Sequence, residues 1–252
     1  MARVSIVMAY YNRWEQLKQT LESLALSMHD FEIIIVDDGS DEDNNLEGYV
    51  DPFLDIKVIR INPSEKTWHN PCIPFNIGFK EATGDIIIIQ NPECIHVGDI
   101  VDYAIENMEE NKYITFACYS ADEEKTKALS TVYPLLPETV GSILEPFNNA
   151  HPSGDTQNGW YNHSEYNACA LHFCSSIMKK DLERLGGFDE QYANGFAYED
   201  MAFIRKIREW GFKVEICDNP YVVHQAHEPS DYVKNHELFM RNQKLYSTGI
   251  CQ

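Results

Sequence analysis

The sequence has no long hydrophobic run, few basic residues and no closely spaced pair of cysteines. No apolar stretch approaches the ~18 residues that a membrane helix needs, and the amino-terminal segment lacks the three regions of a secretory signal. The 252 residues include seven scattered cysteines, a pattern that argues against a disulfide framework or a structural zinc site. We therefore expect a cytoplasmic protein, without a transmembrane segment, whose thiols are reduced and mostly buried.

Basic residues are outnumbered two to one, since 40 Asp and Glu stand against 20 Lys and Arg and give a formal net charge of -20. Such a surface repels the phosphate backbone of nucleic acids and the anionic face of a membrane. An anionic ligand such as a nucleotide sugar can still bind where a divalent cation neutralises its diphosphate inside an acidic cleft. We therefore expect no nucleic-acid partner and search the sequence for a metal site.

The first ninety residues alternate short apolar runs with stretches of helical periodicity. Four apolar, β-branched runs predict strands, at residues 3–10, 31–38, 56–61 and 84–89. Helical spacing of apolar residues predicts helices over 14–28 and 76–83. This alternation is typical of an α/β fold with a doubly wound, mostly parallel sheet. In such a sheet, ligands bind beyond the carboxyl ends of the strands.

The second half is less regular. Residues 134–166 are rich in Pro, Asn, Gly and aromatics and are too long for an ordinary connection, so we predict a functional loop or lid there. This segment offers polar aromatics that could stack on a sugar, namely Trp160, Tyr161 and His163. Further elements are predicted as strands near 168–178 and 214–224, helices over 180–185 and 198–211, and a helical tail after residue 228.

Six segments occur in an order that resembles the inverting GT-A glycosyltransferases of family two. They are VSIVMAYYNR, IIIVDDGSDED, FNIGFKEATGDIIIIQNPE, GGFDE, YEDMAFIRKIREWG and VVHQAHEP. The resemblance implies one continuous domain, with a Rossmann-like nucleotide-sugar-binding half at 1–95 and an acceptor-binding, catalytic half at 96–252. It implies a hexosyltransferase that moves a sugar from a UDP-sugar donor to a hydroxyl of a glycan or another acceptor.

A uridine pocket is implied at the ends of the first two predicted strands. By resemblance Asp38 contacts the base beside Asp37, while Ala9 and Tyr11 line the same pocket and Tyr11 offers a ring for stacking. The alternative is that Asp-Asp-Gly-Ser only marks a turn after a strand. Relatives also place contacts to the diphosphate or base before the fourth strand, a segment that here offers Lys66, Trp68, His69 and Asn76.

Sugar transfer requires stabilisation of the leaving diphosphate, which a cation held by oxygen ligands provides. Where the family has Asp-x-Asp, this sequence has Asn91-Pro92-Glu93. Glu93 keeps the carboxylate of the usual metal ligand, whereas Asn91 offers an amide to the metal or ribose. His224 resembles a histidine ligand of metal-dependent members, with His227 as the alternative, and imidazole beside carboxylate favours Mn²⁺ over Mg²⁺. In the other interpretation, Glu93 is a solvated acid and the metal site is lost.

An inverting transfer requires one base that accepts the proton of the acceptor hydroxyl. Asp200 matches the family's catalytic aspartate at the start of an amphipathic helix, and Glu199 would orient the acceptor. Ordinary capping of the helix is the alternative role for these two acids.

Two other functions agree with parts of the sequence. A sugar nucleotidyltransferase uses a similar sheet and a metal, but it usually has a glycine-rich phosphate loop after the first strand, and AYYNRWEQ contains no glycine. A non-catalytic nucleotide- or sugar-binding relative would explain Asn91-Pro92-Glu93. The presence of Glu199, Asp200 and His224 favours an enzyme over this second alternative.

Overall fold

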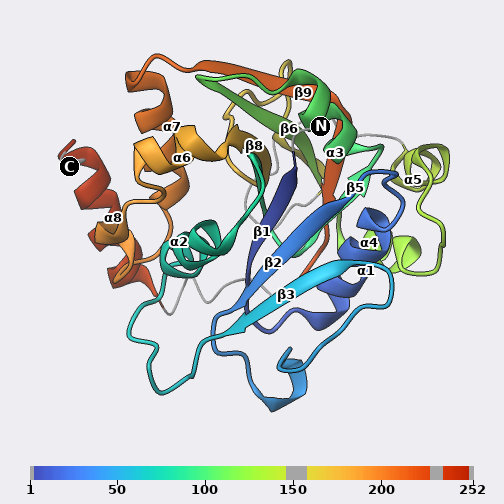
Figure 1. The fold of residues 1–252 in the computed structure, drawn as a ribbon, viewed down its shortest axis with the longest axis horizontal. Helices are drawn as coiled ribbons and strands as arrows, with labels where there is room; N and C mark the ends of the chain where they lie inside the picture. The colour runs from blue at the N-terminus through green and yellow to red at the C-terminus, as the bar shows by residue number, and fades with distance from the viewer. Residues whose placement is uncertain (1–2, 146–157, 228–234, 250–252) are drawn as a thin grey trace.

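The described part of the chain is built around one nine-stranded sheet (Figure 1). The computed structural model describes residues 3–145, 158–227 and 235–249. The strands are β1 (Val4–Tyr10), β2 (Phe31–Asp37), β3 (Asp55–Arg60), β4 (Ile86–Gln90), β5 (Cys94–Val97), β6 (Lys112–Ser120), β7 (Gly159–Asn162), β8 (Cys174–Met178) and β9 (Lys213–His224). Their order in the sheet is β3-β2-β1-β4-β8-β6-β9-β5, and β7 pairs with β6.

The four strands predicted in the first ninety residues are present and form the parallel part of the sheet. β1 pairs in parallel with β2 and β4, and β2 pairs in parallel with β3. The sheet becomes mixed at β8, which is antiparallel to β4 and β6. Because β1, β2 and β4 all run the same way, the residues that follow them meet at one edge of the sheet.

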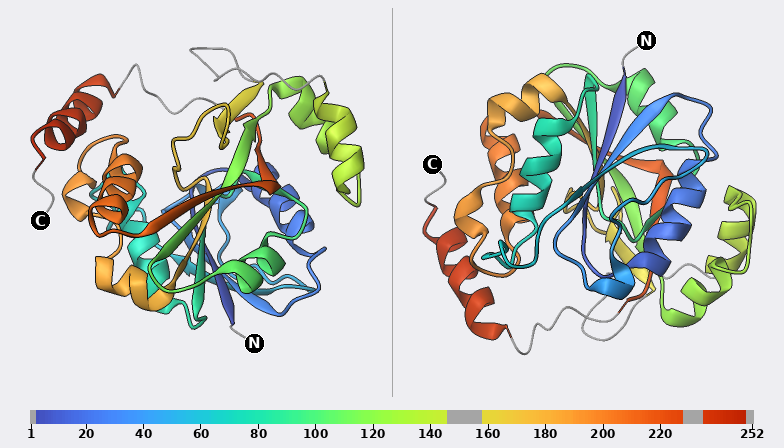
Figure 2. Two further views of the ribbon diagram at one scale, coloured as in Figure 1. Left: turned by 90° about the horizontal axis from the view of Figure 1, so that it is seen from above. Right: turned by 60° about the horizontal axis from the view of Figure 1, so that its bottom comes forward.

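Helices cover both faces of the sheet (Figure 2). They are α1 (Trp14–Leu24), α2 (Cys72–Glu81), α3 (Ile100–Asn107), α4 (Glu123–Leu129), α5 (Pro137–Leu144), α6 (Lys179–Leu185), α7 (Glu199–Glu209) and α8 (His236–Ser247). Side chains of α1 and α3 pack in one hydrophobic cluster, whereas those of α2, α6 and α7 pack in a second cluster on the other face. Within the described residues, no helix has both the length and the apolarity needed to cross a bilayer.

Two predicted helices have different bounds in the structure. α1 ends at Leu24, and Met28, predicted to lie in its apolar stripe, is 92% exposed. α2 begins at Cys72, four residues before the predicted start. Pro74 lies in its first turn, where a missing N–H removes no helical hydrogen bond. Pro74 therefore fits the start of this helix.

The prediction of a loop over 134–166 is corrected in its described parts. Pro137 opens α5, and Val140 and Leu144 are buried one helical turn apart. Trp160 in β7 is 7% exposed and packs edge-on against Tyr119 at 5.1 Å between ring centroids. This indole is part of the core and does not offer a face to a sugar. Residues 146–157 lie outside the described part of the chain.

Close packing of α2 on the sheet gives a test of the fold. A Cβ on Gly78 would overlap Val7 Cγ1 and come within 3.3 Å of Val36 Cγ2. We expect Gly78→Ala to lower the free energy of unfolding by about 1–3 kcal/mol, measured by urea denaturation. Gly141→Ala in α5, where an added Cβ meets nothing within 4 Å, is the control and should be neutral or stabilising. Equal effects in both variants would contradict this account of the α2 packing.

Candidate active site

Two adjoining cavities lie where β1, β2 and β4 end. The larger encloses about 800 Å³ and the smaller about 300 Å³, and the residues Tyr11, Arg13 and Phe196 line both. Asp38, which follows β2, lines the larger cavity, and Asn91, which follows β4, lines the smaller one. The expected location of a ligand site, beyond the carboxyl ends of the parallel strands, therefore holds a continuous pair of cavities.

Asp38 lies in the larger cavity between an indole and an ammonium group. Its Oδ1 accepts a hydrogen bond from Trp68 Nε1 at 2.9 Å, and its Oδ2 lies 2.8 Å from Lys66 Nζ. Burial raises the pKa of Asp38, and the bonds from Lys66 and Trp68 oppose that rise. Lys66 also lies 4.2 Å from the centre of the Tyr11 ring. The cavity thus combines aromatic rings with a buried carboxylate, the groups that a planar base can stack on and donate to.

Asp37 does not share this cavity, although the sequence predicted a nucleotide contact there. The residue is fully buried, its Oδ2 lies 2.5 Å from Arg60 Nη1, and its oxygens also accept backbone N–H groups of Ser40 and Leu46. Both oxygens are therefore bonded within the chain. In the structure Asp37 fixes the turn that follows β2 and does not line the cavity that contains Asp38.

Asn76 is also separated from the other candidates. Its Nδ2 donates to Phe188 O and to Glu190 Oε1, and its Oδ1 accepts from Phe188 N, each at 2.9 Å. These bonds join α2 to the GGFDE segment. The described contacts of this amide are structural ones, and Asn76 lines neither of the two cavities.

Glu93 lies in the wall of the smaller cavity, with Ala9 and Asn91 beside it. The Glu93 side chain is 4% exposed, and its Oε1 lies 2.8 Å from Arg13 Nη1 and 3.3 Å from His224 Nε2. Burial disfavours the charged form, but Arg13 and the histidines prevail and hold the pKa of Glu93 well below its usual range. Glu93 is therefore a buried carboxylate, not a solvated loop acid.

His227 joins His224 beside Glu93, with its Nε2 3.8 Å from Glu93 Oε1. One ligand atom from each of the three residues lies within 4.8 Å of the others. Glu93 Oε2 is buried and has no hydrogen-bond partner within the described residues. A carboxylate with two imidazoles is a donor set that suits Mn²⁺, so these residues fit a divalent cation.

Glu199 and Asp200 begin α7, and Glu199 lines the smaller cavity with Glu93. Asn70 Nδ2 donates to Glu199 Oε2 at 2.5 Å. Burial, together with the neighbouring Asp200, raises the pKa of Glu199 to about 8, and burial also raises the pKa of Asp200. Asp200 Oδ1 accepts the backbone N–H of Met201 at 2.6 Å, so the carboxylate lies against the helix start. The pKa values of both acids are thus shifted upward, the direction that makes a carboxylate a stronger general base.

The backbone before this pair is strained. Ala197 and Tyr198 have φ of 57° and 73°, values that non-glycine residues rarely adopt. Tyr198 packs on Phe239 of α8 at 5.1 Å between ring centroids. Strain of this kind persists only where surrounding contacts impose it, and it is common at functional sites. The strained turn fixes the direction in which Glu199 enters the cavity.

Sequence reasoning assigned no role to Arg13 or Asn70. Arg13 lies within the quoted VSIVMAYYNR segment, but its pairing with Glu93 depends on residues 80 positions away in the chain. Asn70 carries no local signal at all, because its partner Glu199 is 129 residues distant. Only the fold reveals these two contacts.

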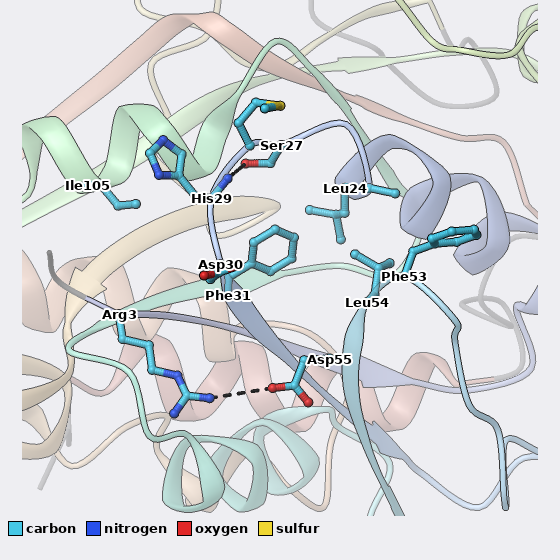
Figure 3. Close-up of a pocket in the computed structure, with 12 residues that line it drawn as sticks. Arg3, Leu24, Ser27, His29, Asp30, Phe31, Phe53, Leu54, Asp55 and Ile105 are labelled. Atoms are coloured by element: carbon cyan, nitrogen blue, oxygen red, sulfur yellow. Dashed lines mark hydrogen bonds and ion pairs between the residues drawn. The ribbon is translucent and has the colours of Figure 1, made fainter.

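A third cavity, of about 1000 Å³, is drawn in Figure 3 and lies at the opposite edge of the sheet from the other two. Phe31 and Asp55, which line it, begin β2 and β3. Arg3 lies 3.7 Å from Asp55 in this cavity. Because ligands of doubly wound sheets bind at the carboxyl ends of the strands, we place the candidate site at the two smaller cavities.

The sequence model of glycosyl transferase family 2 matches residues 5–184. The chain belongs to glycosyl transferase family 2. An uncharacterized glycosyltransferase of Rickettsia felis is 30% identical over 135 residues, which cover 52% of this chain and 21% of that protein. The poly(ribitol-phosphate) beta-N-acetylglucosaminyltransferase TarP of Staphylococcus aureus is 25% identical over 114 residues, 42% of this chain and 34% of that protein. The matches thus span between a fifth and a third of these two family members.

Solved structures of glycosyltransferases share the fold. The mannosyltransferase PcManGT from Pyrobaculum calidifontis, in complex with GDP-Man and Mn²⁺, has a TM-score of 0.60 at 14% identity and covers 100% of this chain and 65% of that chain. TarS 1–349 of S. aureus, in complex with UDP-GlcNAc, has a TM-score of 0.63 at 15% identity and covers 90% and 60% of the two chains. These similarities confirm the predicted GT-A fold.

Proposed function

We propose that this family 2 member transfers a hexose from a UDP-sugar to a hydroxyl of a glycan or another acceptor, with inversion and with a divalent cation, Mn²⁺ or Mg²⁺. The observation that carries this proposal is the junction of the two cavities. A pocket with Asp38 and Trp68 adjoins a second one lined by Glu93 and Glu199, and the two pockets share lining residues. A nucleotide in the first cavity would direct its diphosphate and sugar into the second.

The larger cavity supports the uridine assignment. Asp38 can accept the imide N–H of uracil or a ribose hydroxyl, and the rings of Tyr11 and Trp68 provide faces for stacking. Two structural neighbours bear on the donor class, since the PcManGT structure contains GDP-Man and that of TarS contains UDP-GlcNAc. We choose UDP because the Asp-Asp-Gly-Ser segment resembles the uridine pocket of the family, in which Asp38 would accept the imide N–H of uracil.

The proposed chemistry gives separate roles to the cluster around Glu93 and to the pair of acids at the start of α7. A cation held by Glu93, His224 and His227 would neutralise the charge of the leaving diphosphate. Asp200 accepts the proton of the acceptor hydroxyl while that oxygen attacks the anomeric carbon and the bond from this carbon to the diphosphate breaks. Glu199, fixed by Asn70, orients the acceptor. Attack from the side opposite the diphosphate inverts the anomeric configuration.

The division into halves is part of the same proposal. Residues 1–95 supply Asp38 and Glu93 and would bind the nucleotide sugar. Residues 96–252 supply Glu199 and Asp200, and would bind the acceptor. The Asn70–Glu199 hydrogen bond and the Glu93–His224 contact cross this boundary, so both halves build one site.

The donor assignment is tested by calorimetry of UDP and GDP binding in the presence of Mn²⁺. We expect UDP to bind more tightly, and we expect Asp38→Ala to weaken UDP binding by about 10–100-fold, the effect of losing a hydrogen bond between a charged group and its ligand. Asp43→Ala, which removes the same charge from an exposed turn, is the control and should bind UDP like the wild type. Unchanged affinity in Asp38→Ala would place the base elsewhere.

A further inference from the structure

Arg13 lies at the junction of the two cavities and lines both. Arg13 comes three residues after the end of β1. The residue before it, Asn12, has a φ of 51°, which changes the direction of the chain after the strand. Arg13 Nη1 lies 2.8 Å from Glu93 Oε1 and 3.0 Å from His227 Nε2. The guanidinium therefore contacts two of the three side chains that fit a divalent cation, at the point where the diphosphate of a bound donor would pass.

The charges at this point constrain what can bind. Glu93 carries one negative charge, and Arg13 already balances it at hydrogen-bond distance. A divalent cation that joins Glu93 alone places two further positive charges beside the guanidinium in a partly buried site, where like charges repel strongly. A diphosphate brings the negative charge that both cations need, and a planar guanidinium suits phosphate oxygens because it donates two parallel hydrogen bonds.

We propose that Arg13 is a diphosphate-binding residue that shares Glu93 with the cation. Its guanidinium pairs with Glu93 before the donor binds and with the diphosphate afterwards, which leaves the carboxylate to the metal. Cation and nucleotide consequently bind with positive coupling, each raising the affinity of the other by the same factor. This inference rests on the proposed function for the identity of the anion, whereas the competition between Arg13 and the cation is independent of it.

The test is a titration of the whole chain with Mn²⁺, carried out with and without UDP. The concentration of free Mn²⁺ is measured by electron paramagnetic resonance. Without UDP, Arg13→Met should bind Mn²⁺ about tenfold more tightly than the wild type, because the competing charge is gone. UDP should raise the Mn²⁺ affinity of Arg13→Met by a smaller factor than it raises the Mn²⁺ affinity of the wild type. Arg13→Met should also bind UDP more weakly when Mn²⁺ is absent.

Two variants serve as controls. Arg3→Met makes the same change of charge at the opposite edge of the sheet, where Arg3 pairs with Asp55, and should bind Mn²⁺ like the wild type. Arg13→Lys keeps the charge but loses the paired donors, so Mn²⁺ affinity should stay near the wild-type value while UDP affinity falls. Mn²⁺ affinity that is unchanged or lower in Arg13→Met would overturn the inference. Failure of every variant to bind UDP would instead refute the proposed donor and leave the comparison of Mn²⁺ affinities valid.

Discussion

Replacement of Asp200 by Asn should lower kcat by ~10²-fold or more while donor and cation affinities stay near the wild-type values. Asparagine keeps the shape of the side chain and can still accept the backbone N–H of Met201. It cannot take the proton of the acceptor hydroxyl. Steady-state kinetics together with calorimetry of UDP binding separate loss of the base from loss of binding.

The dependence of kcat on pH is a second test of the same variant. Burial raises the pKa values of both Asp200 and Glu199, so the base form is gained only as pH rises above the usual carboxyl range. We expect kcat of the wild type to rise with pH above the usual carboxyl range, and Asp200→Asn to lose the part of this rise that Asp200 contributes. Retained turnover in Asp200→Asn, or a loss of UDP binding as large as its loss of turnover, would remove Asp200 from the role of base.

Glu93→Ala should lower Mn²⁺ affinity, measured with UDP present, by ~10²-fold, because it removes the charged ligand of the cation. Turnover should fall with it at low Mn²⁺ and recover in part at high Mn²⁺, since the diphosphate oxygens still coordinate the ion. His224→Ala should act in the same direction with a smaller effect, because a neutral ligand is lost.

The matched control for Glu93→Ala is Asn91→Ala, which alters the same wall of the smaller cavity without removing a charge. Asn91 offers only a neutral amide beside Glu93, with its Nδ2 3.5 Å from Glu93 Oε1, so its loss should lower Mn²⁺ affinity much less than the loss of the Glu93 charge. If Glu93→Ala bound Mn²⁺ as tightly as Asn91→Ala does, the cation would have to lie elsewhere, and the cluster of Glu93 with two histidines would be only a structural contact.

Strands β1, β2 and β4 could be predicted because each is a short, mostly apolar run, whereas β3, at the end of the strand order, alternates polar and apolar residues. Strands buried on both faces show no alternation, and polar residues such as Asp38 and Glu93 mark where β2 and β4 end. Their meeting at one edge follows from the parallel arrangement alone. The roles of Glu199 and Asp200 came from resemblance, because two acids at a helix start are equally typical of a cap.

The remaining features depend on contacts between distant segments. Asp37 and Asp38 are neighbours in the sequence, yet Arg60 engages the first and Trp68 the second. Likewise, nothing near Asn76 indicates that its amide bonds to Phe188, 112 residues away. Local sequence specifies which residue types follow a strand, but only the packed chain decides which of them face a cavity.

The prolines of residues 134–166 show that local composition can also give a wrong prediction. A segment rich in Pro, Gly and Asn was predicted as a loop, but proline in the first turn of a helix removes no intrahelical hydrogen bond. The burial of Val140 and Leu144 stabilises α5 despite the composition of the segment. Tertiary packing thus overrides local propensity here.

Incubation of the chain with UDP-sugars, with Mn²⁺ or with a chelator, and analysis of the released sugar by proton NMR test the account most directly. Water can act as a slow acceptor, so the measurement requires no knowledge of the natural one. We predict Mn²⁺-dependent release of UDP from at least one donor, with a first-formed sugar of inverted anomeric configuration and with ~10²-fold less product from Asp200→Asn. Release that is unaffected by chelation, or a product of retained configuration, would contradict the account.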